Sequence, residues 1–204
     1  MRYLLLPVLY LLSTFNLMAS DQNYRLEEVV YSRDPLLKGY LARPEGKGPF
    51  PAVIYHHGGL GEHLGGCPKE TSIALAKAGY VGFSPIRRKT KPMKDAIEDA
   101  HAAMEFLNKL DYVDQTNLGV LGFSRGGYLA FFNGTNNPNV KAMVIMACAP
   151  GRGDQETFFS AVQNVKAPVL LLVAENDNEQ TDLVALTKTI KQMLDKESKD
   201  VKLI

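Results

Sequence analysis

The serine at position 124 lies in a Gly-x-Ser-x-Gly motif, residues 122–126, which has the residue types of a nucleophile elbow. Apolar runs at residues 118–121 and 128–132 flank the motif, and this order predicts a strand, a sharp turn and a helix. Glycines two places on either side of Ser124 let the strand and the helix approach without Cβ clashes. The hydroxyl would then be exposed at the positive end of the helix, where a serine can act as a nucleophile; the alternative is an ordinary serine in a glycine-rich turn.

A glycine-rich loop, residues 57–61, offers backbone N–H groups for the oxyanion that forms when a nucleophile attacks an acyl group. The loop follows a continuous apolar run at residues 52–55, which is typical of a strand buried on both faces. The candidate donors are the backbone N–H groups of Gly58, Gly59, Leu60 and Arg125. The alternative is a flexible loop, and the Ser124 motif downstream favours the oxyanion site.

An acidic residue, Asp177, follows the apolar strand predicted over residues 168–174. A carboxylate just past the carboxyl end of a strand is well placed to orient a histidine, and Asp177 fits this spacing better than Glu175 or Asp182. The alternative is an aspartate that caps a turn or the helix predicted over residues 182–194.

The segments that must position these groups alternate between strands and helices. Further strands are predicted over residues 24–32, 36–43, 80–84, 143–147 and 199–204, and further helices over residues 68–78 and 93–110. The first two strands form a hairpin around a short turn. This order calls for a mostly parallel sheet with helices on both faces and an N-terminal antiparallel hairpin at its edge.

The composition suits one globular domain over residues 21–204, with 46% hydrophobic and 22% charged residues. Lysine and arginine number 23 against 22 acidic residues, so the chain has no electrostatic reason to bind nucleic acid or an acidic membrane. We expect neither a metal nor an organic cofactor, because no residues cluster at metal-ligand spacing and the glycines lack a phosphate-binding pattern. The composition leaves the oligomeric state open.

Residues 1–20 have the features of a secretory signal peptide: a basic start at Arg2, an apolar core over residues 3–17, and small residues near position 20. An uncleaved membrane anchor is the alternative, because the apolar core is borderline in length for a membrane span. Cleavage would release an exported protein, periplasmic or extracellular, without stable membrane insertion. In such an oxidising compartment Cys67 and Cys148 could form one disulfide or remain two thiols.

A basic run carries five positive charges within residues 87–94. If the strands are parallel, this segment opens at the same sheet edge as Ser124 and could attract an anionic substrate. The alternative is a solvated face.

The order of these parts resembles the α/β-hydrolase fold, and more closely its dienelactone-hydrolase-like branch, near the prolyl-oligopeptidase-type catalytic domains. The motifs that carry the resemblance are Leu-Ala-Arg-Pro at residues 41–44, His-Gly-Gly at 57–59, Gly-Phe-Ser-Arg-Gly-Gly at 122–127 and the segment 171–177. The resemblance implies hydrolysis of small esters by acyl transfer to Ser124, with Asp177 orienting a histidine. Dienelactone hydrolases usually carry cysteine at the nucleophile position, so lactone specificity is not implied here.

The same resemblance implies a catalytic histidine in a loop after the last strand. The four histidines, His56, His57, His63 and His101, all precede Asp177, so we expect residues 21–204 to lack that final loop. His101 is expected at the surface, and His57, nearest to Ser124, belongs to the glycine-rich loop. Two alternatives therefore stay open: a non-catalytic member of the fold that binds a small acyl compound, and a peptidase-like acyl hydrolase.

The signal peptide is directly testable. Mass spectrometry of the protein isolated from its native host should find a mature N-terminus near Asp21, because signal peptidase cuts after small residues such as those near position 20. An intact Met1 on protein recovered from the cytoplasm contradicts the prediction.

Overall fold

The computed structural model describes residues 24–61, 66–89, 93–150, 154–177 and 182–204. Within them the strands are β1 (Tyr24–Arg33), β2 (Leu36–Pro44), β3 (Phe50–His56), β4 (Val81–Pro85), β5 (Val113–Phe123), β6 (Val140–Met146), β7 (Val169–Leu172) and β8 (Val201–Leu203). The helices are α1 (Pro68–Lys77), α2 (Met93–Leu107), α3 (Arg125–Asn136), α4 (Gln155–Ala161) and α5 (Leu183–Lys196), with a 3-10 turn at Val162–Asn164. The predicted signal peptide lies outside the described residues.

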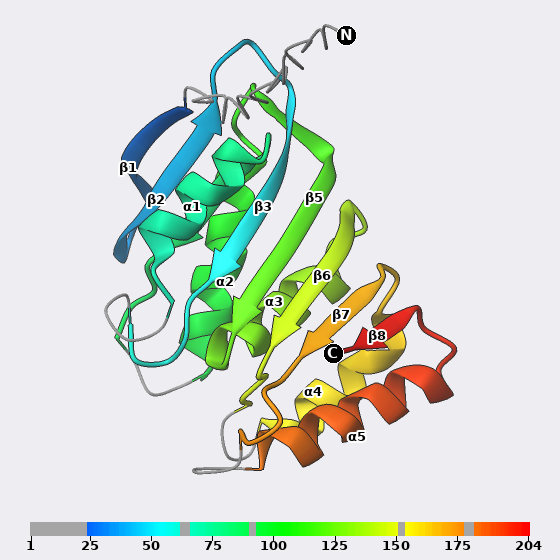
Figure 1. Cartoon of the computed structure of the whole chain (residues 1–204). Helices are drawn as coiled ribbons and strands as arrows, with labels where there is room; N and C mark the ends of the chain where they lie inside the picture. The colour runs from blue at the N-terminus through cyan, green and yellow to red at the C-terminus, as the bar shows by residue number, and fades with distance from the viewer. Residues whose placement is uncertain (1–23, 62–65, 90–92, 151–153, 178–181) are drawn as a thin grey trace, which may run out of the picture.

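The described strands form one eight-stranded sheet in the order β1-β2-β4-β3-β5-β6-β7-β8 (Figure 1). Strands β1 and β2 pair antiparallel, as do β2 and β4, whereas β4, β3, β5, β6, β7 and β8 run parallel. The predicted fold class is therefore confirmed, including the N-terminal hairpin at the edge of the sheet.

Helices cover both faces of this sheet. All five residues of β4 are buried, and successive side chains of a strand point to opposite faces, so both faces of β4 are covered. Gly82 faces α1, because a Cβ at this position would lie 2.7 Å from the Leu75 side chain. Phe83 faces the opposite way and packs on Phe106 in α2, with ring centroids 5.3 Å apart.

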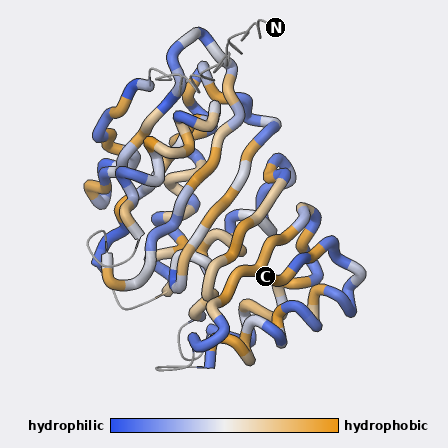
Figure 2. Tube along the Cα trace, in the orientation of Figure 1, coloured by the Kyte–Doolittle hydropathy of each residue, from blue (hydrophilic) through white to orange (hydrophobic). Residues whose placement is uncertain are grey.

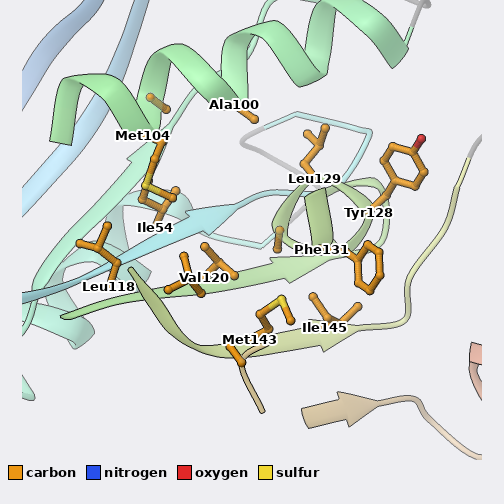
Figure 3. Packing of buried hydrophobic residues seen from close by; sticks show 14 of the residues in the cluster. Ile54, Ala100, Met104, Leu118, Val120, Tyr128, Leu129, Phe131, Met143 and Ile145 are labelled. Atoms are coloured by element: carbon orange, nitrogen blue, oxygen red, sulfur yellow. The ribbon is translucent and has the colours of Figure 1, made fainter. Parts of the chain in front are cut away.

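Much of the hydrophobic core lies between the central strands and the helices α2 and α3 (Figure 3). Phe131 of α3 stacks on Phe158 of α4 with ring centroids 4.1 Å apart, and both are fully buried. Ile145 of β6 and Val120 of β5 are also buried in this core. Burying each such side chain contributes about 2 kcal/mol, which fixes α3 against β5 and thereby the turn that joins them. Figure 2 shows apolar stretches along the central strands and a mixture of polar and apolar residues along α5.

Several predicted boundaries differ from the structure: β5 begins at Val113 and β6 at Val140, before the predicted starts at 118 and 143, and α4 stands where no helix was predicted. The helix predicted over residues 93–110 ends at Leu107, and the chain then tightens into a turn in which the Leu110 N–H donates to the Leu107 carbonyl at 3.2 Å. Leu110 still packs against the core, which explains why the apolar periodicity continues beyond the helix. Among the described helices, none has the length and apolar character needed to cross a membrane.

The register of the parallel strands brings the predicted site residues to one edge of the sheet. His56 pairs with Gly122 across β3 and β5, and Phe123 pairs with Met146 across β5 and β6. Met146 in turn pairs with Leu172 across β6 and β7. The segments that follow β3, β5, β6 and β7 therefore leave the sheet side by side.

Candidate active site

Ser124 lies in the turn between β5 and α3 with φ 55° and ψ −120°, a backbone conformation that residues other than glycine rarely adopt. The neighbouring segment after β6 holds this turn in place. The Ser124 N–H donates to the Met146 carbonyl at 2.9 Å, and the Ser124 carbonyl accepts from the Ala149 N–H at 3.1 Å. The predicted strand, sharp turn and helix are thus confirmed, with the serine half-buried at the N-terminus of α3.

The glycines around Ser124 are required by close backbone contacts. A Cβ at Gly122 would collide with the Gly126 carbonyl, and a Cβ at Gly126 would collide with the His56 carbonyl at the end of β3. Gly127 packs on Cys148, where a Cβ would lie 3.3 Å from the Cys148 Cα. The elbow is therefore built against both neighbouring strands, as the spacing of small residues predicts.

The structure brings the candidate oxyanion donors next to the elbow. A Cβ at Gly59 would lie 3.7 Å from Arg125 Nε, so the glycine-rich loop and the first turn of α3 are in contact. Gly58 precedes this contact, and the side chain of Leu60 projects outward, with the residue 75% exposed. The glycine-rich loop thus contacts Arg125, the residue that follows Ser124.

The described histidines are not placed to accept a proton from Ser124. His56 is fully buried, and its Nε2 accepts a hydrogen bond from Asn133 Nδ2 at 2.9 Å. His57 donates from Nδ1 to the Gly58 carbonyl at 2.8 Å, and its Nε2 accepts from the Arg87 N–H at 3.5 Å. Both ring nitrogens of His57 are therefore engaged. Burial, together with the charge of Arg87, lowers the pKa of His57 to about 4, so the ring is neutral at pH 7.

The other two histidines give no base either among the described residues. His101 is exposed on α2, as predicted, and His63 lies outside the described residues. No hydrogen bond joins Ser124 to a histidine in the part of the chain that the structure describes.

Asp177 follows β7 at the same sheet edge as Ser124. Its N–H donates to the Ala174 carbonyl at 3.2 Å, and its carbonyl accepts from the Leu183 N–H at 3.1 Å. Its carboxylate makes no hydrogen bond within the described residues. Asp182, by contrast, caps α5 by accepting from the Ala185 N–H at 2.8 Å, so the structure gives Asp182 a capping role and leaves the Asp177 carboxylate available.

The sequence profile of the Dienelactone hydrolase family matches residues 84–204, which is more than half of the chain. The chain belongs to this family. A protein named "Putative carboxymethylenebutenolidase" from Aquifex aeolicus is 25% identical over 174 residues, covering 76% of this chain and 73% of its own length. An uncharacterized peptidase of Bacillus subtilis is 24% identical over 194 residues, covering 77% of this chain and 75% of its own.

Solved structures show the same fold. The crystal structure of a protein named "Putative Dienelactone Hydrolase" from Klebsiella pneumoniae superposes with a TM-score of 0.74 at 20% identity, and the match covers 89% of this chain and 85% of that chain. Acylaminoacyl peptidase from Pyrococcus horikoshii gives a TM-score of 0.71 at 19% identity, covering 89% of this chain but only 36% of its own. The protein is therefore a dienelactone-hydrolase-family hydrolase with the α/β-hydrolase fold, and the predicted resemblance is confirmed.

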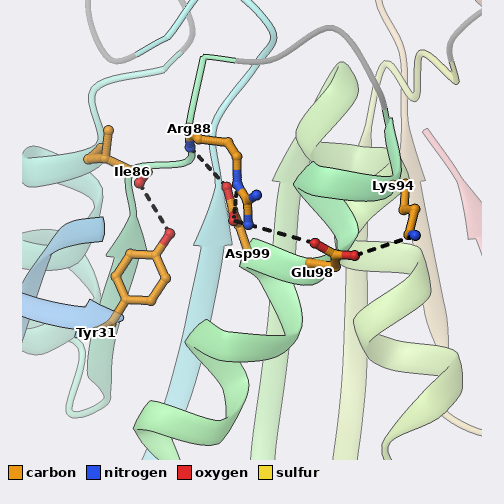
Figure 4. A network of polar contacts seen from close by, with 6 residues as sticks. All are labelled: Tyr31, Ile86, Arg88, Lys94, Glu98 and Asp99. Carbon is orange, nitrogen blue, oxygen red and sulfur yellow. Dashed lines mark hydrogen bonds and ion pairs between the residues drawn. The ribbon is translucent and has the colours of Figure 1, made fainter. Parts of the chain in front are cut away.

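In this family member the two arginines of the basic run after β4 are bound within the protein. Arg88 donates from its backbone N–H and its Nε to the carboxylate of Asp99 at 2.9 and 2.7 Å, and Lys94 lies 4.0 Å from Glu98 (Figure 4). Arg87 is buried beneath the glycine-rich loop. Two arginines of the run are thus committed to internal contacts, which weakens the hypothesis that the run attracts an anionic substrate.

The sequence predicts no structural role for three buried polar residues, Arg87, Asp99 and Asn133. The burial of Asp99 could have been predicted from helical spacing, because Asp99 lies three residues after Ala96 on the apolar stripe of α2. In the structure Asp99 is fully buried. Asn133 lies on the buried face of α3 and also donates to the Ala100 carbonyl at 3.2 Å. The burial of Arg87 could not be predicted from its neighbours in the sequence, because its hydrogen-bond partners, His57 and Gly58, lie 30 and 29 residues earlier.

The two cysteines are free thiols in the structure. Cys67 is exposed at the start of α1, whereas Cys148 is fully buried beside the elbow. Burial raises the pKa of the Cys148 thiol, so Cys148 remains protonated and behaves as a packing residue.

Breaking the pair of Arg88 and Asp99 should destabilise this member of the family. Asp99→Ala leaves the Arg88 guanidinium, whose side chain is 25% exposed, without its buried carboxylate, so we expect the free energy of unfolding to fall by about 3 kcal/mol. Urea denaturation measures this change.

The matched control for this substitution is Asp195→Ala, which removes the exposed carboxylate that pairs with Lys191 at 2.7 Å. It should cost about 0.5 kcal/mol or less. If the two substitutions lowered the free energy of unfolding equally, the buried pair of Asp99 would contribute no more to stability than an exposed pair.

Proposed function

We propose that this hydrolase cleaves carboxylic esters, or related acyl bonds, of small substrates through an acyl-enzyme on Ser124. The observation that carries the proposal is the backbone of Ser124, with φ 55° and ψ −120°, held between β5 and α3 by glycines that tolerate no side chain. A strained turn of this kind persists only when the surrounding structure over-determines it, and such turns are concentrated at functional sites.

The proposed reaction is an acyl transfer in two steps. Ser124 Oγ attacks the acyl carbon as its proton passes to a base, and the resulting oxyanion accepts hydrogen bonds from the Arg125 N–H and from N–H groups of Gly58 to Leu60. The tetrahedral intermediate then expels the alcohol, which takes the proton. Water hydrolyses the acyl-enzyme by the same route and regenerates the serine.

The base in this scheme is a histidine that Asp177 orients, and in α/β-hydrolases that histidine follows the acid in the chain. His56 and His57 support this assignment. His56 is fully buried with Nε2 bound to Asn133, so its unpartnered Nδ1 carries the ring proton, and both ring nitrogens of His57 are bound. We also propose that the enzyme acts outside the cytoplasm after removal of residues 1–20.

Two other functions have an observation in their favour. A peptidase-like acyl hydrolase is favoured by the Bacillus subtilis relative that is named a peptidase. A non-catalytic binder of small acyl compounds is favoured by the absence of a histidine beside Ser124 among the described residues. The substrate bond and the presence of turnover distinguish these candidates from the esterase.

The nucleophile can be tested by covalent labelling of the natural gene product. A fluorophosphonate probe should label Ser124, because the probe reacts with an activated serine hydroxyl, and Ser124→Ala should abolish both labelling and hydrolysis of a short-chain nitrophenyl ester. Ser160→Ala is the matched control, since Ser160 is exposed on α4 and donates only to the Thr157 carbonyl. Equal labelling of the Ser124→Ala variant would refute the assignment.

The need for a further histidine can be tested with a polypeptide of the printed 204 residues. Loss of the histidine in a serine protease lowers kcat by about a million-fold, so this polypeptide should be a very slow esterase. Fusion to the histidine-bearing loop that follows the last strand of a close relative should restore turnover. If the unfused polypeptide came within about tenfold of the fusion and lost activity with Ser124→Ala, a histidine among the 204 residues would be the base.

A further inference from the structure

We infer that Arg87 is a positioning residue for the oxyanion site: its guanidinium holds two successive carbonyls of the glycine-rich loop and so aims the Gly58 and Gly59 N–H groups at the reacting acyl group. This inference rests on the proposed function and goes beyond it by assigning a role to a residue that contacts neither Ser124 nor substrate.

The contacts of Arg87 are specific to the loop. Nη1 donates to the His57 carbonyl at 2.8 Å, and Nη2 donates to the Gly58 carbonyl at 3.0 Å. The planar guanidinium presents these two donors in a rigid fork, so it fixes both carbonyls relative to each other. Arg87 is only 8% exposed, which makes it a support beneath the loop rather than a group facing the cleft.

Arg87 makes no ion pair among the described residues. The nearest buried carboxylate, Asp99, is bound to Arg88. Burial, assisted by the charge of Arg125, lowers the pKa of Arg87 to about 10, so the protein bears a desolvation cost to keep this cation in place. A buried charge with peptide carbonyls as its partners is a poor source of net stability, which points to a positional role.

The planarity of the peptide bond converts these contacts into an orientation. In a trans peptide the C=O and the N–H point in opposite directions. The His57 carbonyl shares its peptide with the Gly58 N–H, and the Gly58 carbonyl shares its peptide with the Gly59 N–H. With both carbonyls directed at Arg87, both N–H groups are directed away from it. Gly59 lies against Arg125, the residue after Ser124, so the loop adjoins the elbow.

The Gly58 carbonyl also accepts a second hydrogen bond, from His57 Nδ1 at 2.8 Å. Two donors on one carbonyl polarise its peptide group, and such polarisation strengthens the N–H on the other side. The Arg87 backbone N–H in turn donates to His57 Nε2, which sets the tautomer that leaves Nδ1 as a donor. Arg87 thus acts on the Gly59 N–H both directly and through His57.

The experiment compares the same substitution at two adjacent arginines in the natural gene product. Arg87→Lys keeps the charge but cannot span two carbonyls, and Arg87→Met removes both contacts. Loss of one oxyanion donor costs about 100-fold in kcat, so we expect Arg87→Met to lower kcat by about this factor and Arg87→Lys by about tenfold, with KM changing less than about threefold. Arg88→Lys is the control, since Arg88 binds Asp99 and not the loop; it should lower Tm while leaving kcat within about twofold.

The Ki of a trifluoromethyl ketone inhibitor reports directly on the oxyanion site, because the adduct that the ketone forms with serine carries an oxyanion. If Arg87 only stabilised the fold, this Ki would not change in the folded variants. Across the Arg87 variants the Ki should rise by the same factor as kcat/KM falls. The inference is overturned if folded Arg87→Lys retains wild-type kcat and Ki, or if KM alone rises. If Arg87→Met does not fold, the test rests on Arg87→Lys. Activity that survives Ser124→Ala would instead refute the proposed function and the inference with it, whereas activity that depends on Ser124 but not on Arg87 overturns the inference alone.

Discussion

The close contact between the Gly126 backbone and the His56 carbonyl is the constraint on which the rest of the site depends. It joins the N-terminus of α3 to the end of β3, although the two segments belong to different strand-helix units. Any side chain at Gly126 would push them apart and separate Ser124 from the glycine-rich loop. The parallel pairing of β3 with β5, in which His56 lies opposite Gly122, is what makes so short an approach available.

Around this contact the protein arranges its buried charges in two different ways. Arg88 meets a fully buried carboxylate, Asp99, and the pair ties the segment after β4 to α2. Arg87, the next residue along the chain, meets peptide carbonyls of the glycine-rich loop. The Arg88–Asp99 pair joins two elements of the scaffold, whereas the Arg87 guanidinium fixes the directions of two loop carbonyls. Two neighbouring arginines therefore serve the scaffold and the site separately.

Membership of the dienelactone hydrolase family establishes a hydrolase, but the fold is shared by proteins that carry esterase and peptidase names. Function in such folds depends on the site rather than on the sheet. In this chain the nucleophile position holds serine, and the described histidines are bound to Asn133, Gly58 and Arg87 or exposed on α2. The chemistry that we propose therefore rests on the serine, its loop and the carboxylate of Asp177.

Apart from α4, which was not predicted, the amino-acid sequence by itself determined the succession of strands and helices, because hydrophobic periodicity and turn residues act over a few neighbouring positions. It also determined the elbow, since Gly122, Ser124 and Gly126 lie within one turn of chain. The partners of Arg87 and His56 were decided only by the tertiary structure, because they lie 30 and 77 residues away. In the sequence the charges of the basic run look alike. Whether each one faces solvent, a carboxylate or a carbonyl depends on which strands become neighbours, and that is a property of the assembled sheet.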